Sequence, residues 1–267
     1  MDVMQILRFL LYFIIYSFFG WILESIYKSF IEKKIINSGF LFGPFCPIYG
    51  FGACIMILCL EPFKNNAILL FIASFFIMSI WEYIVGWFLE KQFNTKYWDY
   101  TGNFLNIKGR VCLKNSTFWG ILGLIFMMWI HPVTEKYVII LNNETLLYLN
   151  IILLAAIGVD AIITIIKMKS LDSTVEAIKE LGETIKVKIS ELKDLGSDSI
   201  EKVKSTEILI EDLKRKQAIL KVRLYRYVIR LKKAFPTIKS DSISQLLNQK
   251  IDLKALKEKI KKKIDKK

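Results

Sequence analysis

The chain has 267 residues, 54% of them hydrophobic, and a formal net charge of +13. This composition excludes a single soluble globular domain and fits a membrane protein joined to a soluble part. Residues 167–267 contain 27 Lys/Arg and 15 Asp/Glu (27 − 15 = +12), whereas residues 1–166 contain 11 and 10 (11 − 10 = +1). We therefore predict a transmembrane domain over residues 1–169 and a helical, coiled-coil cytoplasmic tail over residues 170–267.

Five apolar segments approach the roughly 20 residues that a helix needs to cross a bilayer. They cover about residues 6–27, 40–60, 67–90, 116–131 and 146–166. The second contains Pro44 and Pro47, and proline removes a backbone donor and disfavours helix in the residue before it. We predict an all-α membrane protein with five transmembrane helices, the second of them interrupted.

Basic residues in the short loops predict the orientation. Loops 28–38 and 91–115 hold eight Lys/Arg, whereas the alternate loops hold only Lys64 and Lys136. Cytoplasmic loops are enriched in Lys and Arg. The N-terminus is therefore predicted outside and the tail inside the bacterial inner membrane.

Two stretches of the chain indicate an internal repeat. The pattern G-W-x-x-E occurs at Gly20–Glu24 and at Gly86–Glu90, and an eleven-residue interval separates Gly39 from Gly50 and Gly109 from Gly120. These matches predict a two-fold parallel repeat whose interrupted segments are 39–52 and 109–123. Interrupted segments in both halves of a membrane protein point to a binding site or pathway. The candidate residues there are Gly43, Pro44, Cys46, Pro47, Tyr49, Gly50, Trp119 and Gly120.

Two acidic residues lie deep inside predicted spans. Glu82 is about eight residues from the cytoplasmic end of its span, roughly 12 Å deep at helical rise, and Asp160 has a similar depth. Carboxylates at such depth usually face a partner or a water path. We expect Glu82, Arg110 and Asp160 to form a polar cluster in a cytoplasm-facing cavity; the alternative is a structural ion pair.

Three further charged residues are secondary candidates. Glu24 is an interfacial carboxylate or part of the same pathway, and Lys108 is a second possible cation near Glu82. Asp99 is expected to accept a hydrogen bond from nearby backbone or to pair with a basic loop residue. Its neighbours, Tyr97–Tyr100, resemble a membrane-surface anchor, and His131 is expected to be interfacial or to cap a helix end.

Catalytic and metal-binding motifs are missing from the sequence. The four cysteines and the single histidine form no C-x-x-C or Cys/His cluster, so neither a disulfide framework nor a zinc site is expected. No P-loop, hydrolase or dinucleotide motif is present. We predict no catalytic residue, metal or cofactor, and ATP hydrolysis by this chain is not expected.

Apolar residues in the tail recur at intervals of three and four. This spacing predicts two helices, over about residues 171–192 and 203–231, that form an antiparallel hairpin ended by Pro236. Asp198 and Glu201 are a predicted N-cap pair, and a third, basic helix is predicted over about 241–265. The tail is a candidate for homo-oligomer formation or partner docking, and its basic end for contact with anionic lipid; nucleic-acid binding is not expected.

The same motifs resemble a bacterial family of putative ABC-transporter type IV permeases over about residues 5–132. The matching residues are Gly20, Trp21, Glu24, the stretch Gly39–Ala53, Glu82, Trp98–Tyr100, Gly109–Leu113, Trp119 and Gly120. The resemblance implies a permease-like subunit in the lipid bilayer, with its ATPase on a separate chain. The alternatives are a membrane scaffold that recruits a partner through the tail and, less favoured, a lipid-acting enzyme with Glu82 and Asp99 as acids.

Overall fold

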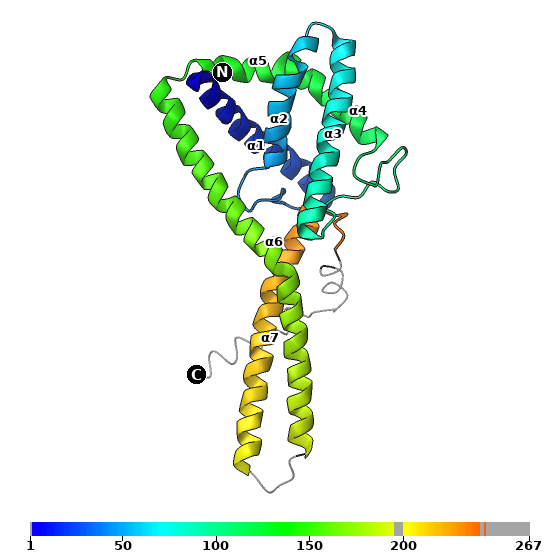
Figure 1. The fold of residues 1–267 in the computed structure, drawn as a ribbon, viewed down its shortest axis with the longest axis vertical. Coiled ribbons are helices and arrows are strands. Elements are labelled where there is room, and N and C mark those ends of the chain that lie inside the picture. The colour runs from blue at the N-terminus through cyan, green and yellow to red at the C-terminus, as the bar shows by residue number, and fades with distance from the viewer. Residues whose placement is uncertain (1, 195–199, 241–242, 244–267) are drawn as a thin grey trace. The chain divides into compact units, whose positions relative to one another are not determined.

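The computed structural model describes residues 2–194, 200–240 and 243, and these are mainly helical (Figure 1). The chain divides into two compact units. The first, called here the membrane unit, combines Met1–Ile165 with Leu231–Lys239; the second, the tail unit, combines Ile166–Arg230 with Ser240–Lys267. In the described residues the backbone forms two isolated β-bridges, and no β-strand extends beyond a single bridge.

Four described helices are long and apolar enough to cross a membrane. They are α1 (Val3–Glu32), α3 (Ala67–Phe93), a continuous helix over Leu113–Ile139, and α6 (Asn143–Asp194). The chain therefore has the helical membrane class that the sequence predicts.

The predicted second span is helical only from Pro47. Its helix, α2, covers Pro47–Leu60 and continues as the 3-10 turn η1 (Glu61–Phe63). The 14 residues of α2 span roughly 21 Å at helical rise, less than the roughly 30 Å of a bilayer core. Gly39, at φ +95°, and the two prolines keep the preceding segment out of the helix. The five-span count stays a prediction.

The predicted fourth span extends beyond residue 131. It consists of α4 (Leu113–Ile125), the π-helical turn η2 (Phe126–Ile130) and α5 (His131–Ile139). Pro132 follows η2 and lacks the N–H that a regular helix would use there, which accounts for the wider turn. In Figure 1, α5 runs crosswise to α2 and α3 at one end of the membrane unit.

His131 packs among aromatic side chains of the membrane unit. Its side chain is buried at 8% exposure, its Nδ1 lies 3.0 Å from Tyr16 Oη, and its ring stacks on Phe126 at 5.7 Å. His131 lies where η2 ends and α5 begins, and because the helix continues past it, its side chain packs inside the bundle. Its position at the membrane interface stays a prediction.

Glycines bring the helices of the membrane unit together in pairs. The helix α1 packs chiefly against α2, and α3 against α4. A Cβ atom at Gly50 would overlap Ser17 Oγ, and one at Gly123 would overlap Ser74. Small residues at such contacts let helix backbones approach closely in membranes. Two similar helix pairs are compatible with a two-fold repeat, which stays a prediction.

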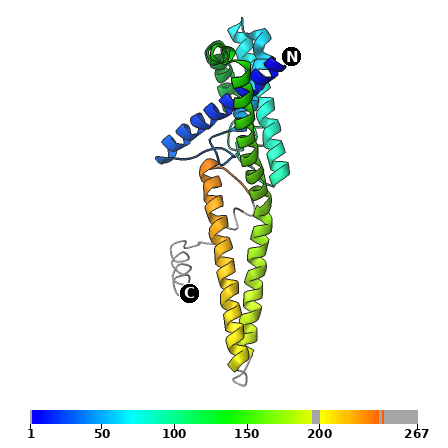
Figure 2. The same ribbon diagram turned by 90° about the vertical axis from the view of Figure 1, so that its left-hand side faces the viewer.

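In the tail unit, the end of α6 and α7 (Ile200–Ala234) form the predicted antiparallel hairpin (Figure 2). Gln217 Nε2 donates to the carbonyl oxygen of Ile178 across the hairpin at 2.9 Å. The helix α7 ends two residues before Pro236, as expected. The predicted cap at Asp198 and the third helix over 241–265 lie outside the described residues, and coiled-coil geometry stays a prediction.

Candidate functional site

Glu82 is a residue of α3, and its side chain faces α4, where it is buried at 5% exposure. Its place follows from helical spacing, because the buried residues of α3 recur every four positions: Leu70, Ser74, Met78 and Glu82. Glu82 Oε1 accepts from Asn115 Nδ2 at 2.6 Å and from Tyr100 Oη at 3.2 Å, and Oε2 accepts from Trp119 Nε1 at 3.1 Å. All three donors are neutral, and within the described part of the chain no ion pair involves Glu82. The site is thus a buried carboxylate held by uncharged groups.

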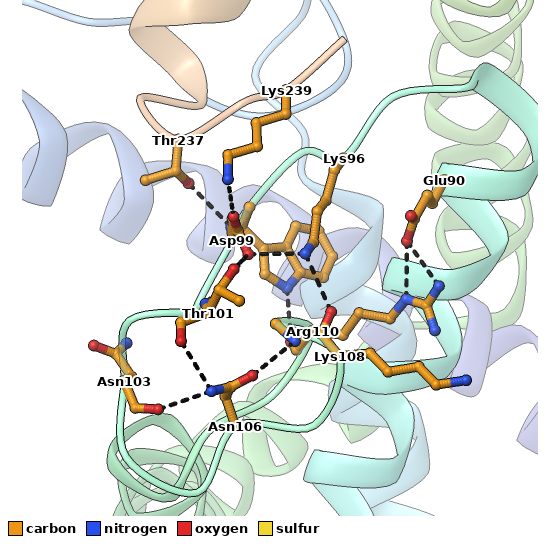
Figure 3. Close-up of polar contacts among 12 residues, drawn as sticks. Glu90, Lys96, Asp99, Thr101, Asn103, Asn106, Lys108, Arg110, Thr237 and Lys239 are labelled. Carbon is orange, nitrogen blue, oxygen red and sulfur yellow. Dashed lines mark hydrogen bonds and ion pairs between the residues drawn. The ribbon is translucent and has the colours of Figure 1, made fainter.

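Arg110 does not join Glu82, contrary to the prediction. Its Nε and Nη2 donate to Glu90 Oε2 at 3.0 and 2.8 Å, and its Nη1 donates to Tyr83 Oη at 3.0 Å. Glu90 stands eight residues after Glu82, roughly 12 Å further along α3, close to the loop that carries Arg110 (Figure 3). The guanidinium therefore pairs with the carboxylate at the helix end.

Asp160 also lies apart from Glu82. Its carboxylate accepts from the backbone N–H of Phe42 at 3.0 Å and of Gly43 at 2.6 Å, and Thr164 Oγ1 donates to it at 3.3 Å. A Cβ atom at Gly43 would come within 2.9 Å of Asp160 Oδ2, so glycine permits this approach. Asp160 supplies acceptors for the interrupted segment between α1 and α2, whose donors have no helical partner. The predicted three-residue cluster is replaced by three separate sites.

The other residues of the first interrupted segment fix its entry into α2. Cys46 is buried and its N–H donates to the carbonyl oxygen of Ser17 at 2.8 Å. Pro47 is the first residue of α2, the position where a missing N–H costs least. Pro44 lies in the non-helical part of the first segment.

In the second interrupted segment, a Cβ atom at Gly120 would approach the Phe71 ring to 2.6 Å.

Glu24 and Glu82 are connected by two aromatic side chains. Glu24 accepts from Tyr49 Oη at 2.7 Å and pairs with Lys28 at 2.6 Å. The Tyr49 ring lies beside the Trp119 ring, with centroids 6.2 Å apart, and Trp119 donates to Glu82. Tyr49 directly precedes Gly50, and Trp119 directly precedes Gly120, the corresponding glycine of the predicted repeat. The repeat singled out both residues, but the sequence did not show that they meet.

Asp99 is the centre of a second polar cluster, in the loop after α3 (Figure 3). It accepts from Lys96 Nζ at 2.8 Å, from the Thr101 N–H at 3.2 Å, from Thr101 Oγ1 and from Lys239 Nζ. Burial acts to raise the pKa of Asp99, but the hydrogen bonds from Lys239, Lys96 and Thr101 outweigh it and hold this pKa well below its ordinary value. The expected pairing with a basic loop residue and nearby backbone is confirmed, whereas the contact with the tail residue Lys239 was not foreseen.

The loop folds tightly around Asp99. Gly109 has φ +66°, and a Cβ atom there would overlap Asp99 Oδ1, so both conformation and space favour glycine. Lys108 contributes its carbonyl oxygen, which accepts from Lys96 Nζ at 3.1 Å, while its side chain points away from Asp99 (Figure 3).

The predicted membrane-surface anchor at residues 97–100 was wrong. Tyr97 is 2% exposed, Trp98 Nε1 donates to the Arg110 carbonyl oxygen at 2.8 Å, and Tyr100 reaches Glu82. The loop folds back under α3 and uses its aromatic side chains internally. In residues 2–194, 200–240 and 243, no three His, Cys, Asp or Glu side chains are placed to share a metal ion.

These features define an α-helical membrane protein with paired helices and a buried carboxylate between two of them. A model of the family described as "Putative ABC-transporter type IV" matches residues 11–165, and the chain belongs to this family. The match includes the predicted fifth span, which the resemblance over residues 5–132 had left out. No curated protein and no solved structure matches the chain.

Proposed function

We propose that this chain is the permease-like membrane subunit of an ABC-type transporter whose ATPase is a separate chain. The observation that carries the proposal is that Glu82 is a buried carboxylate inside a span. All three of its hydrogen-bond donors are neutral. Ionisable side chains inside spans are expensive and mark substrate or ion pathways. The family's description supports the same class.

The arrangement around Glu82 favours a substrate with positive charge. The connected set of Glu24, Tyr49, Trp119 and Glu82 has two aromatic rings and two carboxylates. Glu24 is already paired with Lys28, so Glu82 is the carboxylate without a cation in the described residues. Aromatic faces and carboxylates together attract organic cations. The non-helical part of the first interrupted segment, residues 39–46, donates hydrogen bonds to Asp160. Membrane proteins tolerate such backbone only in protein interiors or along wet cavities.

The proposed topology has five crossings, with the N-terminus outside and the tail in the cytoplasm of a bacterial inner membrane. In this arrangement α2 and the segment before it make the second crossing together, and α5 lies along the outer surface. Lys and Arg counts in the loops support the orientation.

Mass spectrometry of the complex extracted in mild detergent tests the proposed function. We expect a stoichiometric ATPase subunit to copurify with the full-length chain. Self-assembly without an ATPase would contradict the permease proposal. Deletion of the tail, residues 170–267, then shows whether a copurifying partner binds the tail or the transmembrane domain.

A scaffold role is the second candidate, and the tail hairpin favours it. The helix α6 covers Asn143–Asp194, and its residues after Ile165 belong to the tail unit. Under this reading, deletion of the tail spares membrane insertion and removes the recruited partner, whereas retained recruitment would count against it. The lipid-enzyme alternative loses support because Asp99 is already paired with two lysines.

A further inference from the structure

The chain returns to the membrane unit after the tail hairpin. Residues Leu231–Lys239, which are the last turn of α7 and the segment after it, belong to the membrane unit. Within them, Phe235–Lys239 form a segment called here the strap. Lys96 and Lys239 exchange both backbone hydrogen bonds of an antiparallel bridge, at 2.9 and 2.8 Å. Thr237 Oγ1 accepts from the Asp99 N–H at 3.2 Å, and Lys239 Nζ donates to Asp99.

Apolar contacts hold the other side of the strap. The Phe235 ring meets the Tyr97 ring edge-on, with centroids 5.0 Å apart, and Lys28 Nζ lies 5.0 Å above the same ring. Lys28 also donates to the carbonyl oxygen of Ala234, and Ile238 is 5% exposed. The strap therefore combines backbone pairing with packed side chains, the features by which proteins bind an added extended segment. Lys239, its last residue, adds an ion pair with Asp99.

The loop that receives the strap also serves the Glu82 site. Asp99, which binds Lys239, accepts from Thr101, and the N–H of the intervening Tyr100 donates to the Gly109 carbonyl oxygen at 2.8 Å. The Tyr100 hydroxyl donates to Glu82. The strap's ionic partner, Asp99, and a donor to the buried carboxylate, Tyr100, are thus consecutive residues.

We propose that Lys96, Tyr97 and Asp99 form a peptide-docking surface that the strap occupies in cis, and that strap binding regulates the Glu82 site. With the strap bound, the loop over Lys96–Cys112 is held so that Tyr100 caps Glu82. With the strap released, the loop loosens and the carboxylate loses this donor. Because the strap directly follows α7, a partner that displaces the tail helix acts on the strap through the chain itself. The proposal goes beyond transport and does not depend on it.

Cys112 is a native reporter of this loop. Its side chain is 2% exposed and its sulfur accepts from Asn103 Nδ2 at 3.6 Å. Cys54, in α2, is also buried and lies outside the loop. The ratio of Cys112 to Cys54 alkylation by a maleimide, measured on peptides from the full-length protein, therefore separates loop opening from general unfolding.

Two variants release the strap to different degrees, and a third is the control. Lys239→Ala removes a 68% exposed partner of an ion pair, so we expect the labelling ratio to rise about two- to fivefold. Ile238→Ala removes buried apolar surface, and we expect a rise of about tenfold or more. Lys233→Ala changes the same charge at an exposed position near the strap and should leave the ratio at the wild-type value. A ratio that stays at the wild-type value in both strap variants would overturn the proposal.

Discussion

At the scale of single residues, the Glu82 carboxylate accepts hydrogen bonds from three donors. A neutral side chain at this position can accept only some of them. A glutamine at this position keeps the shape, and rotation of its amide with that of Asn115 can restore most of the hydrogen bonds. An alanine leaves the three donors of Tyr100, Asn115 and Trp119 without their acceptor.

We therefore expect Glu82→Ala to lower the free energy of unfolding by about 2–4 kcal/mol and Glu82→Gln by about 1 kcal/mol. Thermal denaturation in detergent measures both, and Glu61→Gln, at an exposed residue paired with Lys64, is the control. Equal losses for alanine and glutamine would show that the charge itself, and not the hydrogen bonds, stabilises the fold.

The lowered pKa of Asp99 leads us to expect that the free energy of unfolding depends on pH. Its folded-state pKa lies below its ordinary value, which is about 3.9 in unfolded chains. A group with a lowered pKa adds stability that is fully present above the unfolded pKa and is lost as the pH falls through that value toward the folded one.

Asp99→Asn should therefore destabilise the protein by about 2 kcal/mol at pH 7, and the difference from wild type should shrink below about pH 4. Melting temperatures of both proteins across this range test the expectation. A difference of the same size at pH 3 and pH 7 would contradict an ionic role for Asp99.

At the scale of elements, the helix pairs rely on glycine. A Cβ atom at Gly50 would come within 2.6 Å of the Phe13 carbonyl oxygen, a backbone atom that cannot move aside easily. Gly158, in α6, has nothing within 4 Å of its Cβ position.

Gly50→Ala should separate α1 from α2 and lower stability by about 1–3 kcal/mol. The matched change Gly158→Ala should be neutral or stabilise α6 by up to about 1 kcal/mol. Thermal unfolding of both variants in detergent compares them, and similar effects of the two changes would argue against close α1–α2 packing.

The strap also gives a geometric prediction. A hydrogen-bonded antiparallel pair has Cα atoms about 5.5 Å apart, within the range that a disulfide spans. Cysteines at Lys96 and Lys239, which form such a pair, should crosslink on mild oxidation in a background without the four native cysteines.

The control pair is Lys136→Cys with Lys239→Cys, because α5 and the end of the strap lie at opposite ends of the membrane unit (Figure 1). Mobility on a non-reducing gel detects the crosslink. Absence of a Lys96–Lys239 crosslink, with both thiols reactive when unfolded, would contradict the bridge.

At the scale of the whole molecule, the proposed topology can be tested by accessibility. Single cysteines at Lys64 and Lys136 should react with a membrane-impermeant reagent in intact cells, because both lie in the predicted outer loops. Single cysteines at Lys33 and Lys188 should react only after the membrane is opened. The reverse pattern would invert the orientation, and reaction of all four in intact cells would contradict the proposed crossings.

The sequence by itself determined the helical membrane class, the break before Pro47, the tail hairpin and the local pairing of Asp99. These properties depend on residues close together along the chain. Apolar length selects spans, proline and glycine interrupt them, and a spacing of three and four selects packed helices. Lys96 and Thr101 lie within three residues of Asp99, so a sequence can indicate them.

Only the tertiary structure decided which partners the buried groups take. Asp160 binds Phe42 from 118 residues away, and Asp99 binds Lys239 from 140 residues away. Charge and depth show that such groups need partners, but several candidates satisfy that need equally well. Packing selects among them: the end of α3 brings Glu90 to Arg110, and α4 places Asn115 and Trp119 at Glu82. The strap follows the same rule, because its docking surface exists only once the loop after α3 has folded around Asp99.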